Sequence, residues 1–164
     1  MESRLALLYR LSVTLGRRKK DFPAAIEVCD HAVDECQAAD LPRRTKIYQE
    51  IWARNIRAYV HVKRRDYDRA FADSDACVEL VTELTMPLEA STIDERFTRT
   101  TVVDNNATLC KFAGMEKELF ARVEKNMILL EQDPPSFGAR FSAGGWMALY
   151  RRKYRLREAI RAAA

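Results

Sequence analysis

The residues best suited to binding a charged partner recur every three or four positions between residues 43 and 64. Side chains with this spacing lie along one face of a helix, where they point into solvent or a groove. The line comprises Arg43, Lys46, Glu50, Arg54, Arg57, His61 and Arg64. Because a guanidinium donates two parallel hydrogen bonds to a carboxylate, we single out Arg54, Arg57 and His61 as contacts for an acidic group. An ordinary solvated helix face, interrupted by Glu50, is the alternative.

Three clusters of basic residues form a second candidate surface, because each comes at the predicted end of the first helix of a pair. They are Arg17, Arg18, Lys19 and Lys20; Lys63, Arg64 and Arg65; and Arg151, Arg152 and Lys153. In a stack of helix pairs these turns share one edge, where their summed charge would attract acidic proteins or phosphates. The alternative is that the cations only complement the negative ends of the helix dipoles. Few aromatic residues lie among the clusters, which argues against stacking of single-stranded nucleic acid bases.

The sequence offers little for catalysis or metal binding. His31 is two residues from Cys29, whereas two metal ligands on one helix need a separation of three or four. Cys29 and Cys36 share a helix face, as two turns of an apolar core stripe do. There is no glycine-rich phosphate loop, nucleophile elbow or HExxH motif. We therefore predict no catalytic residue, no metal ligand and no cofactor. An enzyme whose site is assembled from residues distant in the sequence stays an alternative.

Length and composition favour a single all-α domain. The chain has 164 residues, of which 48% are apolar and 32% charged, with only five glycines and five prolines. This is too hydrophobic for a disordered chain and too poor in turn residues for a sandwich of short strands. The formal charge of +4 permits acidic partners without requiring them.

The cysteines indicate the compartment. Cys29, Cys36, Cys77 and Cys110 are scattered among apolar residues, which is typical of buried free thiols in a reducing environment. We therefore expect a cytoplasmic protein. No segment resembles a secretory leader, and no apolar run approaches the roughly 20 residues of a membrane span, so no membrane association is predicted.

Apolar periodicity predicts four antiparallel helix pairs, at about residues 3–39, 41–84, 92–131 and 136–163. The segment "GRRKK" at residues 16–20 is predicted to end the first helix, and Asp21 and Asp66 are predicted N-caps. Thr92 and Glu95 have the spacing of a capping box, and Gly114 separates the fifth helix from the sixth. The aromatic residues expected between the helices are Trp52, Tyr59, Phe71, Trp146 and Tyr150.

The second pair carries a motif made of Trp52, Tyr59, "DYDRA" at Asp66–Ala70 and Cys77. This pattern resembles a tetratricopeptide repeat (TPR), a family in which a tryptophan opens the first helix and a small alanine sits where the two helices cross. Ala70 would be that alanine. The resemblance implies a right-handed superhelical stack of about four helix pairs. The spacing departs from the family, because Ala25 and Ala70 are 45 residues apart and the standard period is about 34.

The resemblance also implies a function, because such stacks hold peptides in a concave groove with asparagines clamping the peptide backbone. Asn55, Asn105 and Asn106 would be those residues here, although Asn55 equally suits a hydrogen bond between helices. We therefore expect a non-enzymatic scaffold that binds an acidic protein or peptide, as the sensor or dimerisation region of a cytoplasmic bacterial regulator. Nucleic acid is the less favoured partner. The last helix has an uncovered apolar face, which predicts either a homodimer or a longer protein.

Overall fold

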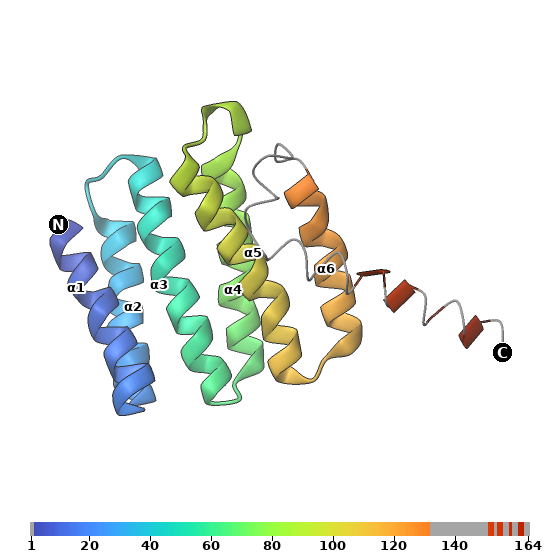
Figure 1. Cartoon of the computed structure of the whole chain (residues 1–164). Coiled ribbons are helices and arrows are strands. Elements are labelled where there is room, and N and C mark those ends of the chain that lie inside the picture. Colours follow the sequence, from blue (N-terminus) through green and yellow to red (C-terminus); the bar gives the residue numbers. More distant parts are fainter. Residues whose placement is uncertain (1, 132–150, 153, 156–157, 159–160, 163–164) are drawn as a thin grey trace. The chain divides into compact units, whose positions relative to one another are not determined.

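The computed structural model shown in Figure 1 describes residues 2–131, 151–152, 154–155, 158 and 161–162. Its helices are α1 (Glu2–Val13), the π-helix η1 (Thr14–Lys19), α2 (Phe22–Ala38), α3 (Arg43–Lys63), α4 (Tyr67–Thr85), the 3₁₀-helix η2 (Leu88–Ala90), α5 (Ile93–Ala113) and α6 (Glu116–Glu131). No strand occurs among the described residues, so the all-α prediction is confirmed for them. Within the same residues, none of the helices combines the length and the apolar character that a membrane crossing requires.

The chain divides into two compact units, Met1–Val102 and Val103–Ala164, and the division falls inside α5. Gly114, the predicted break between the fifth and sixth helices, directly follows the end of α5 at Ala113. The fourth predicted pair, with Trp146 and Tyr150, lies mostly outside the described residues.

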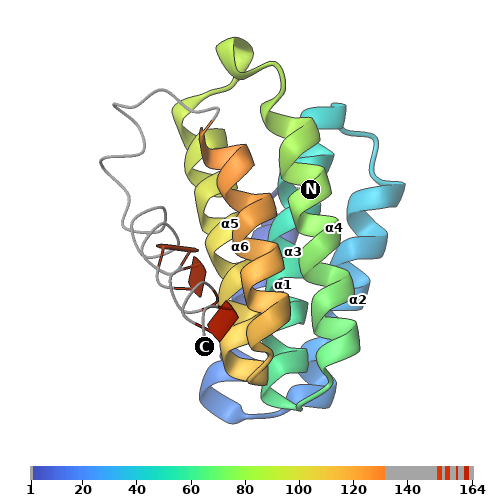
Figure 2. The same ribbon diagram turned by 90° about the vertical axis from the view of Figure 1, so that its right-hand side faces the viewer.

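In the first unit, α1 to α4 form two helical hairpins that pack side by side (Figure 1). Helix α3 contacts both α2 and α4, and Figure 2 shows α2 and α4 on one side and α1 and α3 on the other. The seam between the hairpins consists of small and branched side chains, with Ala25 and Cys29 of α2 packed against Ile56 and Val60 of α3. Removing this apolar surface from water is the main favourable contribution to folding.

The alanine and the aromatic residues of the repeat-like motif are buried to different degrees. Ala70 has no exposed surface, which fits its predicted place at a close helix crossing. Trp52, Tyr59 and Phe71 are only half-buried. The ring of Trp52 makes edge contacts with Tyr9 and Tyr48, at centroid distances of 6.2 and 6.3 Å.

The first helix does not end before its basic residues, contrary to the prediction from "GRRKK". It continues as η1 through Lys19, and Lys20 then takes the left-handed conformation with φ 56°. The backbone N–H groups of Lys20 and Asp21 both donate to the carbonyl of Leu15. Gly16 lets this turn approach α3 closely, because an added Cβ would lie 3.1 Å from Cγ2 of Val60.

Two of the predicted N-caps differ in what their side chains do. Asp21 caps α2, because its Oδ1 accepts a hydrogen bond from the backbone N–H of Ala24 at 3.3 Å. Asp66 holds the N-cap position of α4, but its side chain makes no capping hydrogen bond. Its carboxylate lies instead near His61 and Arg69.

The predicted capping box at the start of α5 is present. The Glu95 N–H donates to Oγ1 of Thr92, and the Thr92 N–H donates to the Glu95 carboxylate at 2.7 Å. Glu95 also accepts two hydrogen bonds from Arg44, at 3.2 and 2.7 Å. Burial opposes ionisation, but the bonds from Arg44 and Thr92 outweigh it and hold the pKa of Glu95 below its ordinary value.

Replacing Thr92 tests the capping box. We expect Thr92→Ala to lower the free energy of unfolding by about 1 kcal/mol, because the Glu95 N–H loses its acceptor. Urea denaturation followed by circular dichroism measures this change. Thr92→Ser keeps the hydroxyl and should unfold close to the wild type, so an equal loss in both variants would contradict the cap.

Candidate functional site

A charged cleft of about 390 Å³ lies between α2 and α4, both of which pack on α3. Its lining residues come from all three helices and are Ile26, Asp30, Arg54, Arg57, His61, Arg69, Ala72 and Asp73. The structure thus brings the three predicted contacts, Arg54, Arg57 and His61, into one cleft. It adds two carboxylates and a third arginine that the sequence analysis did not select. The role of these residues in binding stays a prediction.

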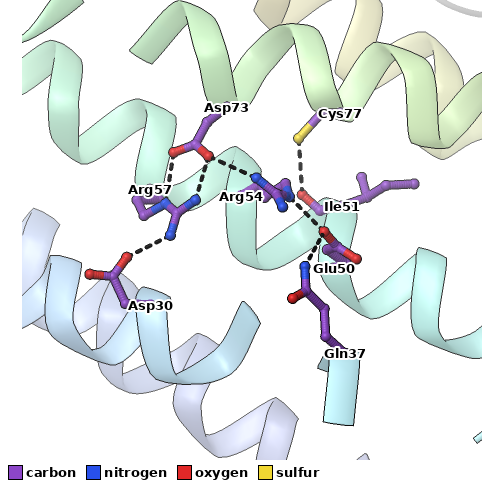
Figure 3. Close-up of polar contacts among 8 residues, drawn as sticks. All are labelled: Asp30, Gln37, Glu50, Ile51, Arg54, Arg57, Asp73 and Cys77. Carbon is purple, nitrogen blue, oxygen red and sulfur yellow. Dashed lines mark hydrogen bonds and ion pairs between the residues drawn. The ribbon is translucent and has the colours of Figure 1, made fainter. Parts of the chain in front are cut away.

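Arg57 is held by carboxylates from both neighbouring helices (Figure 3). Its Nε and Nη2 donate to the two oxygens of Asp73 at 2.8 and 2.6 Å, and its Nη1 donates to Asp30 at 2.5 Å. The Asp73 side chain is 6% exposed, whereas that of Asp30 is 52% exposed. Hydrogen bonding to Asp73 raises the pKa of Arg57, so the guanidinium stays charged. One side chain therefore links three helices.

Arg54 extends this network along α3. Its Nε donates to Oε1 of Glu50 at 2.7 Å, and its Nη1 lies 3.4 Å from Oδ1 of Asp73. Glu50 in turn accepts a hydrogen bond from Gln37 of α2 at 3.3 Å (Figure 3). Glu50 is therefore an ion-pair partner within the line of basic residues and not a break in it. Any acidic ligand would compete with carboxylates of the chain itself.

His61 is almost fully buried, with 3% of its surface exposed. The series of charged residues along α3 therefore does not point uniformly into solvent. The Nδ1 of His61 lies 3.5 Å from Oδ2 of Asp66 and makes no hydrogen bond to any described residue. Burial lowers the pKa of His61; the carboxylates of Asp66 and Asp73 oppose this shift, and Arg57 and Arg69 add to it. The ring is neutral at pH 7, and its Nδ1 is a buried polar atom that lacks the usual partner.

The ion-pair network could have been predicted from the position of Asp73 in the sequence. Asp73 comes three residues after Ala70 and four before Cys77, so it lies on the buried stripe of α4. A buried carboxylate requires a cation, and the basic line on the preceding helix supplies two. Asp30 offers no comparable signal, because it is exposed on α2.

The predicted backbone clamps lie in different environments. Asn55 and Asn105 are half-buried. Asn106 is buried in the second unit, where its Oδ1 accepts a hydrogen bond from Asn126 of α6 at 3.1 Å. The same Asn126 amide donates to the Val103 carbonyl at 3.2 Å. These bonds tie α6 to α5 and explain the burial of Asn106 without a bound peptide.

Two of the three basic clusters meet in the first unit. The guanidinium of Arg17 lies 5.0 Å from the centroid of the Tyr59 ring, and the ammonium of Lys63 lies 5.2 Å from it. In the third cluster, Arg151 pairs with Glu131 at 2.9 Å in the second unit, and Lys153 lies outside the described residues.

The cysteines do not have the properties of nucleophiles. All four are free and buried. Burial raises the pKa of Cys29 and of Cys36 to about 11, and it also raises the pKa of Cys77. Catalytic cysteines instead have a lowered pKa that favours the reactive thiolate. Over the part of the chain that the structure describes, no three His, Cys, Asp or Glu side chains form a set that could hold a metal ion.

An apolar hollow of about 260 Å³ lies apart from the charged cleft, among α1, α2 and α3. It is lined by Tyr9, Ser12, Cys29, Ala32, Cys36, Gln49, Trp52 and Ala53, whose mostly small side chains leave the space unfilled. Its polar lining residues are Tyr9, Ser12 and Gln49, and no charged group lines it. We take the charged cleft as the candidate site, because its polar groups converge from three helices.

Comparison of the chain with models of known families, with curated proteins and with solved structures gives no significant match.

Removing Asp73 tests whether the cleft depends on its ion pairs. We expect Asp73→Ala to lower the free energy of unfolding by about 3 kcal/mol, because Arg57 and Arg54 both lose a nearly buried partner. The matched control is Glu83→Ala, which breaks a two-bond pair with Arg43 whose side chains are 70% and 49% exposed. Exposed pairs stabilise weakly, so this control should unfold like the wild type. Equal effects in urea denaturation would show that the Asp73 network is not a structural constraint.

The lowered pKa of His61 predicts a pH dependence of stability. The unfolded state binds a proton near pH 6.5, but the folded state binds it only at lower pH, so stability is full above about pH 6.5 and falls below it. Between about pH 7.5 and pH 5.5, His61→Gln should show a flatter dependence than the wild type. Urea denaturation across this pH range measures the slope. A wild-type slope in His61→Gln would contradict the assignment.

Proposed function

We propose that the chain is a non-enzymatic, TPR-like scaffold of right-handed stacked helix pairs that binds an acidic protein or peptide segment in the cleft between α2 and α4. The observation that carries the proposal is the Arg57–Asp30 pair. Arg57 is held on its inner side by a nearly buried carboxylate, and its outward Nη1 bonds a half-exposed one. Asp30 therefore occupies the place that a ligand carboxylate would take.

Binding would proceed by exchange of one carboxylate for another. A carboxylate of the partner displaces Asp30 from Nη1 of Arg57, while Asp73 keeps the guanidinium in its orientation. The site is thereby preorganised, so little side-chain ordering opposes binding. The released Asp30 accepts a hydrogen bond from a backbone N–H of the partner, and Arg69, which is 71% exposed, offers a second cation beside it.

The turn between η1 and α2 and the turn between α3 and α4 support the repeat architecture. Asp21 and Asp66 start the second helices of their hairpins with nearly the same backbone, φ −85° and ψ 79° against φ −89° and ψ 72°. Each follows a residue with positive φ, Lys20 or Arg65. Such repetition is expected of a chain built from equivalent hairpins.

The wider role is part of the same proposal. The four buried, free cysteines support a reducing compartment, and a peptide-binding helical scaffold suits the sensor or dimerisation region of a cytoplasmic bacterial regulator. A homodimer remains a prediction.

Releasing Arg57 from Asp30 tests the exchange. We expect Asp30→Asn to bind acidic peptides more tightly, by up to about five-fold, because a partly exposed ion pair contributes up to about 1 kcal/mol. Fluorescence anisotropy with a library of labelled acidic peptides measures the affinity. Asp34→Asn makes the same charge change at an exposed position of α2 and should leave the affinity unchanged.

Arg57→Gln tests the opposite effect. It removes the proposed contact with the ligand carboxylate and should therefore weaken peptide binding. Its melting temperature should be measured first, since Asp73 then keeps only Arg54. A folded Arg57→Gln protein that binds as tightly as the wild type would refute the proposed site, as would equal affinities of Asp30→Asn and Asp34→Asn.

A further inference from the structure

Seven cations gather at one end of the first unit, where η1 connects to α2 and α3 connects to α4 (Figure 1). This basic edge comprises Arg17, Arg18, Lys19, Lys20, Lys63, Arg64 and Arg65, and every one of them is exposed. Tyr59 joins the two groups, because its ring contacts Arg17 and Lys63 at once. The ring therefore holds two like charges from different hairpins close together, an arrangement that an anion between or above them would stabilise.

The basic edge differs from other charged surfaces of the first unit in how its cations are partnered. Arg4, Arg43, Arg44, Arg54 and Arg57 all bind carboxylates. On the edge, six cations, all but Lys63, form no ion pair with any described residue. The nearest acidic residues along the chain are Asp21, which caps α2, Asp66, which lies beside Arg69, and the exposed Asp68. The positive charge of this edge is thus largely unneutralised within the unit.

The backbone gives an independent reason to regard these cations as functional. Lys20 and Arg65 have φ of 56° and 61°, the left-handed conformation that glycine adopts without strain and other residues adopt at a cost. The connection between α5 and α6 meets the same requirement with Gly114, at φ 70°. Both turns of the basic edge instead carry a cation where glycine would be the more stable choice. Strain at two equivalent positions, each occupied by a cation, is the kind of feature that a role outside folding would explain.

The π-helix η1 is the third unusual feature of the edge. It follows α1 directly, ends the first helix, and carries Arg17, Arg18 and Lys19 in a single wide turn. No large apolar side chain is exposed between residues 14 and 22 or between residues 59 and 68. The centre of a protein interface is usually depleted in charged residues and enriched in aromatic ones, so the chemistry of this edge matches a phosphate backbone better than an extended protein surface.

We propose that the basic edge binds the phosphate backbone of a double-stranded nucleic acid, independently of base sequence. Cations on mobile side chains contact phosphates and release counterions, which requires charge and exposure but no apolar centre. A double strand fits better than a single strand, because Tyr59 already contacts Arg17 and Lys63, and a base that stacked on its ring would have to displace them. This surface is separate from the cleft proposed for peptides.

The left-handed residues provide the sharpest test. The double variant Lys20→Gly/Arg65→Gly removes two cations. Because glycine adopts positive φ without strain, the melting temperature of this variant should be unchanged or higher. Binding to a labelled mixed-sequence DNA duplex, measured by anisotropy at about 50 and about 200 mM salt, should weaken. The plot of log affinity against log salt should become shallower by about two, one for each lost phosphate contact.

Two further variants keep the result interpretable. Lys20→Asn/Arg65→Asn also tolerates positive φ and should reproduce the loss of binding. Lys117→Gln/Lys125→Gln removes the same charge from exposed positions of α6 and should bind the duplex like the wild type. Absence of duplex binding by the wild type at about 50 mM salt would overturn the proposal. So would equal affinities of the glycine pair and the α6 pair, or tighter binding of polyglutamate than of the duplex.

Discussion

The first unit depends on one ion pair, between Arg57 of α3 and Asp73 of α4. Asp73 lies on the buried stripe of its helix, where an unpaired carboxylate would be strongly unfavourable. The two parallel hydrogen bonds from Arg57, with the longer contact from Arg54, make its burial tolerable. The same bonds restrict the axial register of α4 on α3, because a shift of one turn would move the carboxylate past both guanidinium groups. Removing one partner of such a pair is strongly destabilising, because it leaves the other charge buried without compensation.

This constraint also determines which charges remain for a partner. Arg54 and Arg57 are the residues whose spacing suggests an acidic ligand, yet the fold already provides them with carboxylates. What the cleft retains is one ion pair to a half-exposed carboxylate, Asp30, and one buried ring nitrogen, at His61, without a hydrogen-bond partner in the described part of the chain. The basic edge has the opposite character, because its cations are exposed and most have no carboxylate among the described residues. The cleft is therefore suited to a ligand with a few carboxylates, and the basic edge to a ligand with many closely spaced negative charges.

Local signals predicted the helices well, because each depends on a few adjacent residues. The capping box at Thr92 and Glu95, the cap at Asp21 and the break at Gly114 are all determined within four residues of chain. The continuation of the first helix through η1 was not predicted, and neither was the close approach of Gly16 to Val60, a residue 44 positions away in the sequence. The same limit applies to the site. The periodicity of α3 identified Arg54, Arg57 and His61, but their partners on α2 and α4 are known only from the packing.

The lack of a significant match in the comparisons is compatible with a repeated architecture, because few side chains are needed to define a helical hairpin. A small residue at the crossing, an acidic residue at the start of the second helix and apolar stripes on both helices suffice, and most other positions are free to vary. In the first unit these requirements are met by Ala25 and Ala70 and by Asp21 and Asp66. The cations before the two aspartates are not among them, since Gly114 serves a similar turn without a charge. Lys20 and Arg65 are not required by the hairpin and adopt a strained backbone conformation. They are therefore the positions at which we expect a functional role.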